Sequence, residues 1–111
     1  MKYERELLKG NTDCLLLSLV NDRPTYGYEI IKELERRSSG YFRFREGTLY
    51  PALHRMEKDK LVKGKWQTLP NGQERRYYYI TDKGRGVLAS KLAVWQDFST
   101  AVRTILRPEP I

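Results

Sequence analysis

The stretch REGTLYPALHRMEKDKL, residues 45–61, decides the fold of this chain. Its apolar residues recur at the spacing of one face of an α-helix. They are Leu49, Ala52, Leu53 and Met56. Pro51 lacks an amide hydrogen and is tolerated best near a helix start, so we predict that the helix begins between Glu46 and Thr48.

The opposite face of this helix carries hydrogen-bond donors and positive charge. Its side chains are those of Tyr50, Pro51, His54, Arg55 and Lys58. A helix that is apolar on one side and polar on the other can lie in the DNA major groove, which is wide enough to admit it. The same pattern also fits a surface helix whose polar face meets only water.

Charge is concentrated around this helix. The chain has 111 residues, enough for one domain, and a formal net charge of +7. Residues 43–86 hold eleven basic and five acidic side chains, so this basic block carries six of the seven net charges. A localised basic block favours a polyanionic partner, although a basic surface without a partner fits as well.

Other classes of protein are disfavoured by what the sequence lacks. One cysteine, Cys14, and one histidine predict neither a disulfide nor a metal site, and we expect no cofactor. The sequence has no apolar run long enough to span a membrane and no leader pattern, which predicts a cytoplasmic protein. Because His54 has no acid or nucleophile spaced to serve it, we do not expect an enzyme.

Two further helices are predicted before the central one. Residues 7–20 form an apolar helix that we expect to be buried on more than one side, partly against a second subunit through Leu15. Thr25 is the predicted N-cap of the next helix. Gly40 is predicted to end that helix by adopting the left-handed conformation at the C′ position. Aromatic residues alternate in residues 41–44, which predicts a short strand.

A hairpin and a last helix are predicted after the central one. Residues 62–68 and 74–80 have strand-like spacing, and the loop between them contains Pro and Asn-Gly. Thr81 is the predicted N-cap of the last helix, which carries a heptad-like apolar seam. We assign that seam, with one residue of the first helix, to a dimer interface of Leu15, Leu88, Leu92, Trp95, Phe98 and Val102.

The order of these elements is that of a winged helix-turn-helix. The predicted fold is mainly α (α+β), with the winged helix DNA-binding domain in residues 1–80 and a C-terminal dimerisation helix in residues 81–107. Residues 108–111 form a tail that we predict to be disordered. In this architecture the third helix enters the major groove, and the hairpin is the wing.

Four segments resemble the PadR family of transcriptional regulators. They are LLKG (7–10), YGYEI (26–30), EGTLYPALHRME (46–57) and RRYYYIT (75–81). The resemblance implies a dimeric winged-helix repressor that binds double-stranded operator DNA. The single C-terminal helix is similar to that of the smaller PadR subgroup, which includes multidrug-sensing members.

The predicted DNA-binding side chains lie on the central helix, the wing and the start of the second helix. They are Tyr26, Thr48, Tyr50, His54, Arg55, Lys58, Arg75 and Arg76. Three of these residues have alternative roles. Thr48 can be a helix cap, and Tyr26 can be a half-buried aromatic residue. One of the two wing arginines can stack on Trp66 across the hairpin and so be unavailable to DNA.

The seam also suggests a site for an effector. Lys91 stands where an apolar side chain is expected, and a cation there needs water or an anion. The resemblance implies a planar aromatic ligand between a pair of tryptophans, which here would be Trp95 of each subunit. Lys91, with Asp13 or Ser99, would then set the polarity of the site. The alternative is that Trp95 only packs in the interface.

Two functions from different classes follow. The first is a dimeric, sequence-specific repressor released by a small molecule. The second is a winged helix that binds only proteins and has no sequence-specific DNA binding. The basic wing favours the first, because a protein-interaction module does not need this concentration of positive charge.

Overall fold

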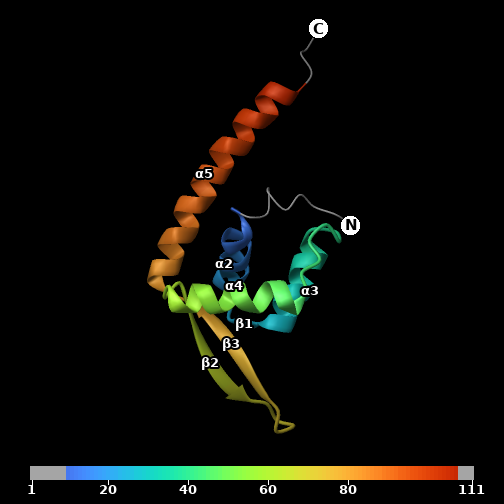
Figure 1. Cartoon of the computed structure of the whole chain (residues 1–111), viewed down its shortest axis with the longest axis vertical. Helices are drawn as coiled ribbons and strands as arrows, with labels where there is room; N and C mark the ends of the chain where they lie inside the picture. Colours follow the sequence, from blue (N-terminus) through green and yellow to red (C-terminus); the bar gives the residue numbers. More distant parts are fainter. Residues whose placement is uncertain (1–9, 108–111) are drawn as a thin grey trace.

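The computed structural model describes residues 10–107. In Figure 1 the helices α2, α3 and α4 form a body from which a β-hairpin extends at one end and α5 at the other. The molecule is therefore elongated, with extents of 64 × 30 × 21 Å. In chain order the elements are α2 (Thr12–Asp22), β1 (Thr25–Tyr26), α3 (Gly27–Arg37), α4 (Glu46–Lys58), β2 (Val62–Thr68), β3 (Glu74–Ile80) and α5 (Asp82–Leu106).

The apolar face of α4 is the centre of the core, as predicted. Leu49, Leu53 and Met56 are fully buried, and Ala52 is nearly so. The helix begins at Glu46, within the predicted window. The surrounding elements contribute buried side chains that include Leu16, Leu17, Val20, Ile30, Val62 and Tyr78.

The predicted N-cap of the second helix is wrong. Thr25 and Tyr26 instead form a short strand, β1, which pairs antiparallel with β3, and α3 begins at Gly27. Main-chain pairing with β3 keeps Thr25 extended and away from the cap position. Its hydroxyl donates to Glu29 at 2.5 Å, so it still stabilises the first turn of α3 through a side chain.

The predicted short strand at residues 41–44 is also wrong. This segment has no strand in the structure, and its aromatic side chains pack edge-to-face with one another. Phe44 is buried in the core, so the alternation reflects inward packing and not sheet pairing. Gly40 is left-handed as predicted, with a φ of +83°, and its amide donates to the Glu35 carbonyl. The first left-handed residue after the helix is however Ser39, with a φ of +52°, which takes the C′ position that we predicted for Gly40.

The hairpin has the predicted bounds. β2 and β3 pair antiparallel along their whole length, and the three strands have the order β1-β3-β2. The tip, residues 69–73, is closed by a 2.7 Å bond from the Leu69 amide to the Gln73 carbonyl. Tyr78 is buried, and Ile80 packs against the core, as expected for the inward face of β3.

α5 begins as predicted and then leaves the body. The Thr81 hydroxyl accepts from the Gly84 amide at 3.0 Å and caps the helix. Leu88, which we assigned to a dimer interface, is part of the core of its own chain. The predicted tail at 108–111 and residues 7–9 of the predicted first helix lie outside the described residues. Gly10 and Asn11, which we predicted to be helical, form a turn before α2 begins at Thr12. No helix in the described part is long and apolar enough to cross a membrane.

Candidate nucleic-acid interface

A concave surface lies between the outer face of α4 and the hairpin. It encloses about 470 Å³, and its lining also includes the start of α3. Five of the predicted DNA-binding residues line it: Tyr26, Tyr50, His54, Arg75 and Arg76. The structure therefore brings together residues that are up to 50 positions apart in the sequence.

The other three predicted residues are exposed but lie outside this concavity. Thr48 is the third residue of α4, and the N-cap is Arg45, so the alternative that Thr48 caps the helix is wrong. Lys58 is the last residue of α4. Arg55 forms an ion pair with Asp13 of α2, which we had placed in the effector site. This pair links α4 to α2.

Tyr50 lies directly against the start of α3. A β-carbon built on Gly27 would lie 2.3 Å from the Tyr50 hydroxyl oxygen, so only glycine leaves room for this ring. Gly27 thereby permits the close approach of α3 and α4. The contact fixes the distance between the first turn of α3 and the outer face of α4.

Arg75 lies on the same face of the three-stranded sheet as Tyr26 of β1. Its guanidinium carbon lies 3.9 Å from the centre of the Tyr26 ring, which is the geometry of a cation–π contact. A hydrogen bond to Tyr77 raises the pKa of Arg75, whose guanidinium is charged at neutral pH in any case. Within residues 10–107, no carboxylate lies within ion-pair distance of Arg75.

Arg76 lies on the other face of the hairpin and has two partners. It stacks on Trp66, its direct neighbour across the strands, at 5.5 Å from the ring centre, which confirms the alternative raised from the sequence. It also donates to Glu57 of α4 at 2.5 Å. Sequence analysis missed the second partner, because 19 positions separate the two residues and no local spacing relates them.

Comparisons with known proteins identify the family to which this fold belongs. The family model described as "Transcriptional regulator PadR-like family" matches residues 16–90, a segment that contains the core, α4 and the whole hairpin. The chain belongs to the PadR-like family. It is thus a regulator of transcription with a winged-helix DNA-binding fold, and the members of this family are not enzymes.

Relatives of this PadR-like chain match along most of its length. Transcriptional regulator Rv3488 of Mycobacterium tuberculosis is 31% identical, with 88% of each chain covered. A PadR-like transcriptional regulator from Bacillus cereus is 35% identical, with a TM-score of 0.82 and coverage of 94% and 99%. A PadR family regulator from Clostridium difficile is 32% identical, with a TM-score of 0.77 and coverage of 86% and 98%.

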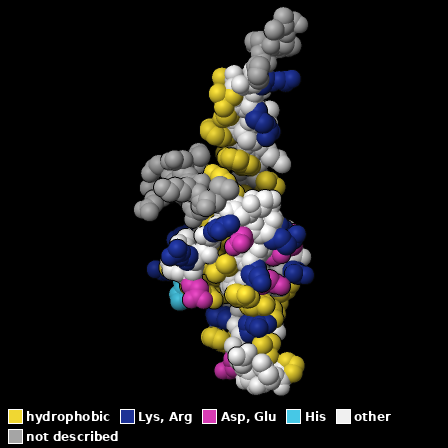
Figure 2. Space-filling model, turned by 90° about the vertical axis from the view of Figure 1, so that its right-hand side faces the viewer, with side chains coloured by type: hydrophobic (Ala, Val, Ile, Leu, Met, Phe, Trp, Pro, Cys, Tyr) yellow, Lys and Arg dark blue, Asp and Glu magenta, His cyan; other side chains and the backbone are white. Residues whose placement is uncertain are grey.

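Part of the α5 surface of the PadR-like chain is apolar, whereas basic, acidic and hydrophobic side chains are mixed over the body. Figure 2 shows Lys and Arg side chains spread over the body and the hairpin, and hydrophobic side chains along one edge of α5 above the body. The exposed apolar residues of α5 include Leu92, Trp95, Phe98, Ile105 and Leu106. Most of the predicted seam beyond Leu88 is thus left uncovered by its own chain.

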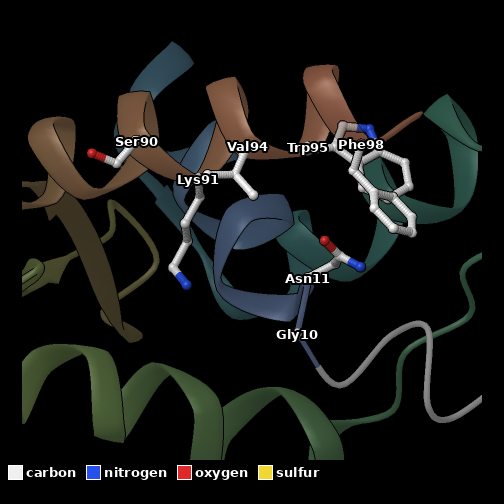
Figure 3. A pocket seen from close by; sticks show the side chains of 7 residues that line it. All are labelled: Gly10, Asn11, Ser90, Lys91, Val94, Trp95 and Phe98. Atoms are coloured by element: carbon white, nitrogen blue, oxygen red, sulfur yellow. The ribbon is translucent and has the colours of Figure 1, made fainter. Parts of the chain in front are cut away.

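A second pocket of about 490 Å³ lies between this part of α5 and the start of α2 (Figure 3). Lys91, Trp95 and Phe98 line it, together with Asn11, the N-cap residue of α2. Of the four residues predicted for an effector site, Lys91 and Trp95 are in the lining. Asp13 and Ser99 are not in it.

The charge of Lys91 also acts on α2. Burial raises the pKa of the Cys14 thiol, and the positive charge of Lys91 partly offsets that shift. Lys91 is therefore close to the first turn of α2 as well as to the pocket.

Proposed function

We propose that this PadR-like protein is a homodimeric, sequence-specific DNA-binding repressor. The observation that carries the proposal is the concavity that is lined by Tyr50 and His54 of α4 and by Arg75 of the wing. A helix with exposed donors beside a charged hairpin matches the way a winged helix meets the major groove and the adjacent backbone. The uncovered apolar edge of α5 supports the dimer.

Selection from a pool of random duplex DNA tests this proposal. A dimer with two recognition helices should enrich a pseudo-palindrome whose half-sites are about 34 Å apart, roughly one turn of DNA. The alternative function, a winged helix that binds only proteins, predicts that no sequence is enriched. The same alternative predicts that binding to random duplex is weak at physiological salt.

Arg75→Ala is expected to weaken binding to operator and random DNA alike. A phosphate contact releases counterions, so the slope of log K against log salt should become shallower by about one unit. Fluorescence anisotropy at several salt concentrations measures this slope. Arg103→Ala, which removes an equal charge from the far end of α5, is the matched control and should leave the slope unchanged. If Arg75→Ala has the wild-type salt slope, Arg75 does not contact a DNA phosphate.

Tyr50→Ala and His54→Ala are expected to reduce discrimination between the selected site and random DNA. Both side chains are exposed on the outer face of α4, where a base-edge contact contributes about 1–3 kcal/mol of discrimination. The ratio of the dissociation constants for random DNA and for the selected site measures this discrimination. Glu46→Gln at the start of α4 is a control on the same helix. If the variants lose affinity for both DNAs equally, these residues position the helix and do not read bases.

The pocket beside α5 is the proposed site for an effector that releases the DNA. In the dimer, Trp95 would stack on a planar aromatic molecule, and Lys91 would favour an anionic one. Titration with planar aromatic acids and cations should quench Trp95 fluorescence, with acids bound more tightly. Trp95→Phe is the control, because Trp66 also emits. Quenching that persists in Trp95→Phe would exclude this pocket.

A further inference from the structure

The guanidinium of Arg76 is enclosed by four residues from three elements. It donates to Glu57 at 2.5 Å, and its central carbon lies 5.5 Å from the Trp66 ring and 5.9 Å from the Tyr78 ring. The fourth side is Gly64, where a β-carbon would lie only 2.6 Å from the guanidinium. The strand β2 therefore leaves a space that the Arg76 side chain fills.

This arrangement connects the wing to the recognition helix. Glu57 belongs to the last turn of α4, whereas Arg76 and Trp66 face each other across the two strands of the hairpin. The two side chains of the ion pair are only 30% and 31% exposed. Such partial shielding from water makes an ion pair stronger than one at a fully exposed surface.

Arg75 and Arg76 differ in what balances their charge. Arg75 stacks on Tyr26 and has no carboxylate within ion-pair distance in the described part of the chain, whereas Glu57 already neutralises Arg76. Counterion release requires a cation whose charge is available to a phosphate. We infer that Arg76 is a positioning residue that fixes the wing on α4, and that Arg75 is the wing arginine that neutralises a DNA phosphate.

This inference rests on the proposed DNA binding, and it assigns Arg76 a different role from the phosphate contact expected from the sequence. A wing held at one angle to α4 meets the DNA backbone without first losing conformational freedom, which favours tight binding. Loosening the wing should therefore lower affinity for the selected site, even when the net charge of the protein does not change.

The first experiment uses the free protein and needs no DNA. Amide hydrogen exchange is compared in wild type, Arg76→Gln, Glu57→Gln and the double variant. Exchange in β2 should become roughly three- to tenfold faster in each, and no faster in the double variant than in the singles. Arg75→Gln is the adjacent control and should leave β2 unchanged. Unchanged exchange in Arg76→Gln would overturn the inference.

A second variant covers the case in which Arg76→Gln does not fold. Arg76→Lys keeps the charge but cannot reproduce the planar fork of the guanidinium. It should also show faster exchange in β2, while its binding to random duplex keeps the wild-type salt slope. If the amides of β2 exchange at the wild-type rate in Arg76→Lys, the planar guanidinium of Arg76 is not what holds the wing on α4.

The second experiment separates positioning from phosphate contact. The double variant Glu57→Gln/Arg76→Gln has the net charge of wild type, so its salt slope on random duplex should be unchanged while affinity for the selected site falls. Arg75→Gln should lose about one unit of slope. A loss of about one unit in the double variant would overturn the inference. If wild type bound no duplex DNA, the proposed function would fail, whereas hydrogen exchange would still decide how the wing is held.

Discussion

Phe98→Glu is expected to convert the protein to a monomer and to lower its affinity for the selected DNA site by about 10²–10⁴-fold. Phe98 is 57% exposed on α5, so its replacement costs little within one chain. In the proposed dimer the same position is buried, and an unpaired carboxylate there is strongly unfavourable. The loss of affinity follows because two linked half-site contacts become one. Sedimentation and anisotropy titration measure the two effects.

Ala93→Glu is the matched control for Phe98→Glu. It introduces the same charge one and a half turns earlier, at an exposed position on the other side of α5. This variant should remain a dimer and bind DNA as wild type does. A dimeric Phe98→Glu protein would place the interface elsewhere and would remove the main support for the effector site.

Leu53→Ala is expected to lower the free energy of unfolding by about 2–5 kcal/mol. Leu53 is fully buried at the centre of the apolar face of α4, so its truncation leaves a cavity that the surrounding helices can fill only in part. A domain of this size is stable by about 5–15 kcal/mol, so the loss is a large fraction of the total. Urea denaturation at fixed protein concentration measures it.

The next residue provides the control for this experiment. His54 is exposed on the outer face of α4, and His54→Ala should change stability by less than about 0.5 kcal/mol. The two variants therefore test the orientation of α4 directly. Equal denaturation curves for both variants would mean that the buried face and the DNA-facing face of α4 are assigned wrongly.

The sequence predicted the parts of the fold that have strong local patterns. The apolar face of α4 has helical spacing, the hairpin has Asn-Gly at its tip, and α5 begins with a threonine cap. The prediction from the sequence was wrong where tertiary contacts override the local preference of a segment for helix or strand. Thr25 is a good cap residue, but pairing with β3 makes it a strand residue. The aromatic residues at 41–44 alternate like a strand but pack into the core and onto one another.

The candidate site was predicted in part, for a similar reason. The helical face of α4 and the position of the wing suffice to bring four of the predicted residues to one concavity, and Tyr26 of β1 is the fifth. The carboxylate partners of Arg55 and Arg76 could not be predicted, because each lies on a different element from its arginine. The Asp13–Arg55 pair spans 42 positions and the Glu57–Arg76 pair 19 positions. Only the packing of α2, α4 and the hairpin brings these charges together.

The close approach of Gly27 and Tyr50 has a consequence for how the sequence can vary. Any side chain at position 27 would occupy the space of the Tyr50 hydroxyl, since a β-carbon there would lie 2.3 Å from it. The two positions should therefore covary among homologues, with alanine or a larger residue at 27 accompanied by a smaller residue at 50. Gly27→Ala alone should impair the DNA-facing surface, and a compensating substitution at position 50 should restore its packing. Divergence in this family would then proceed through paired changes at these positions, because each intermediate carries a clash or a void.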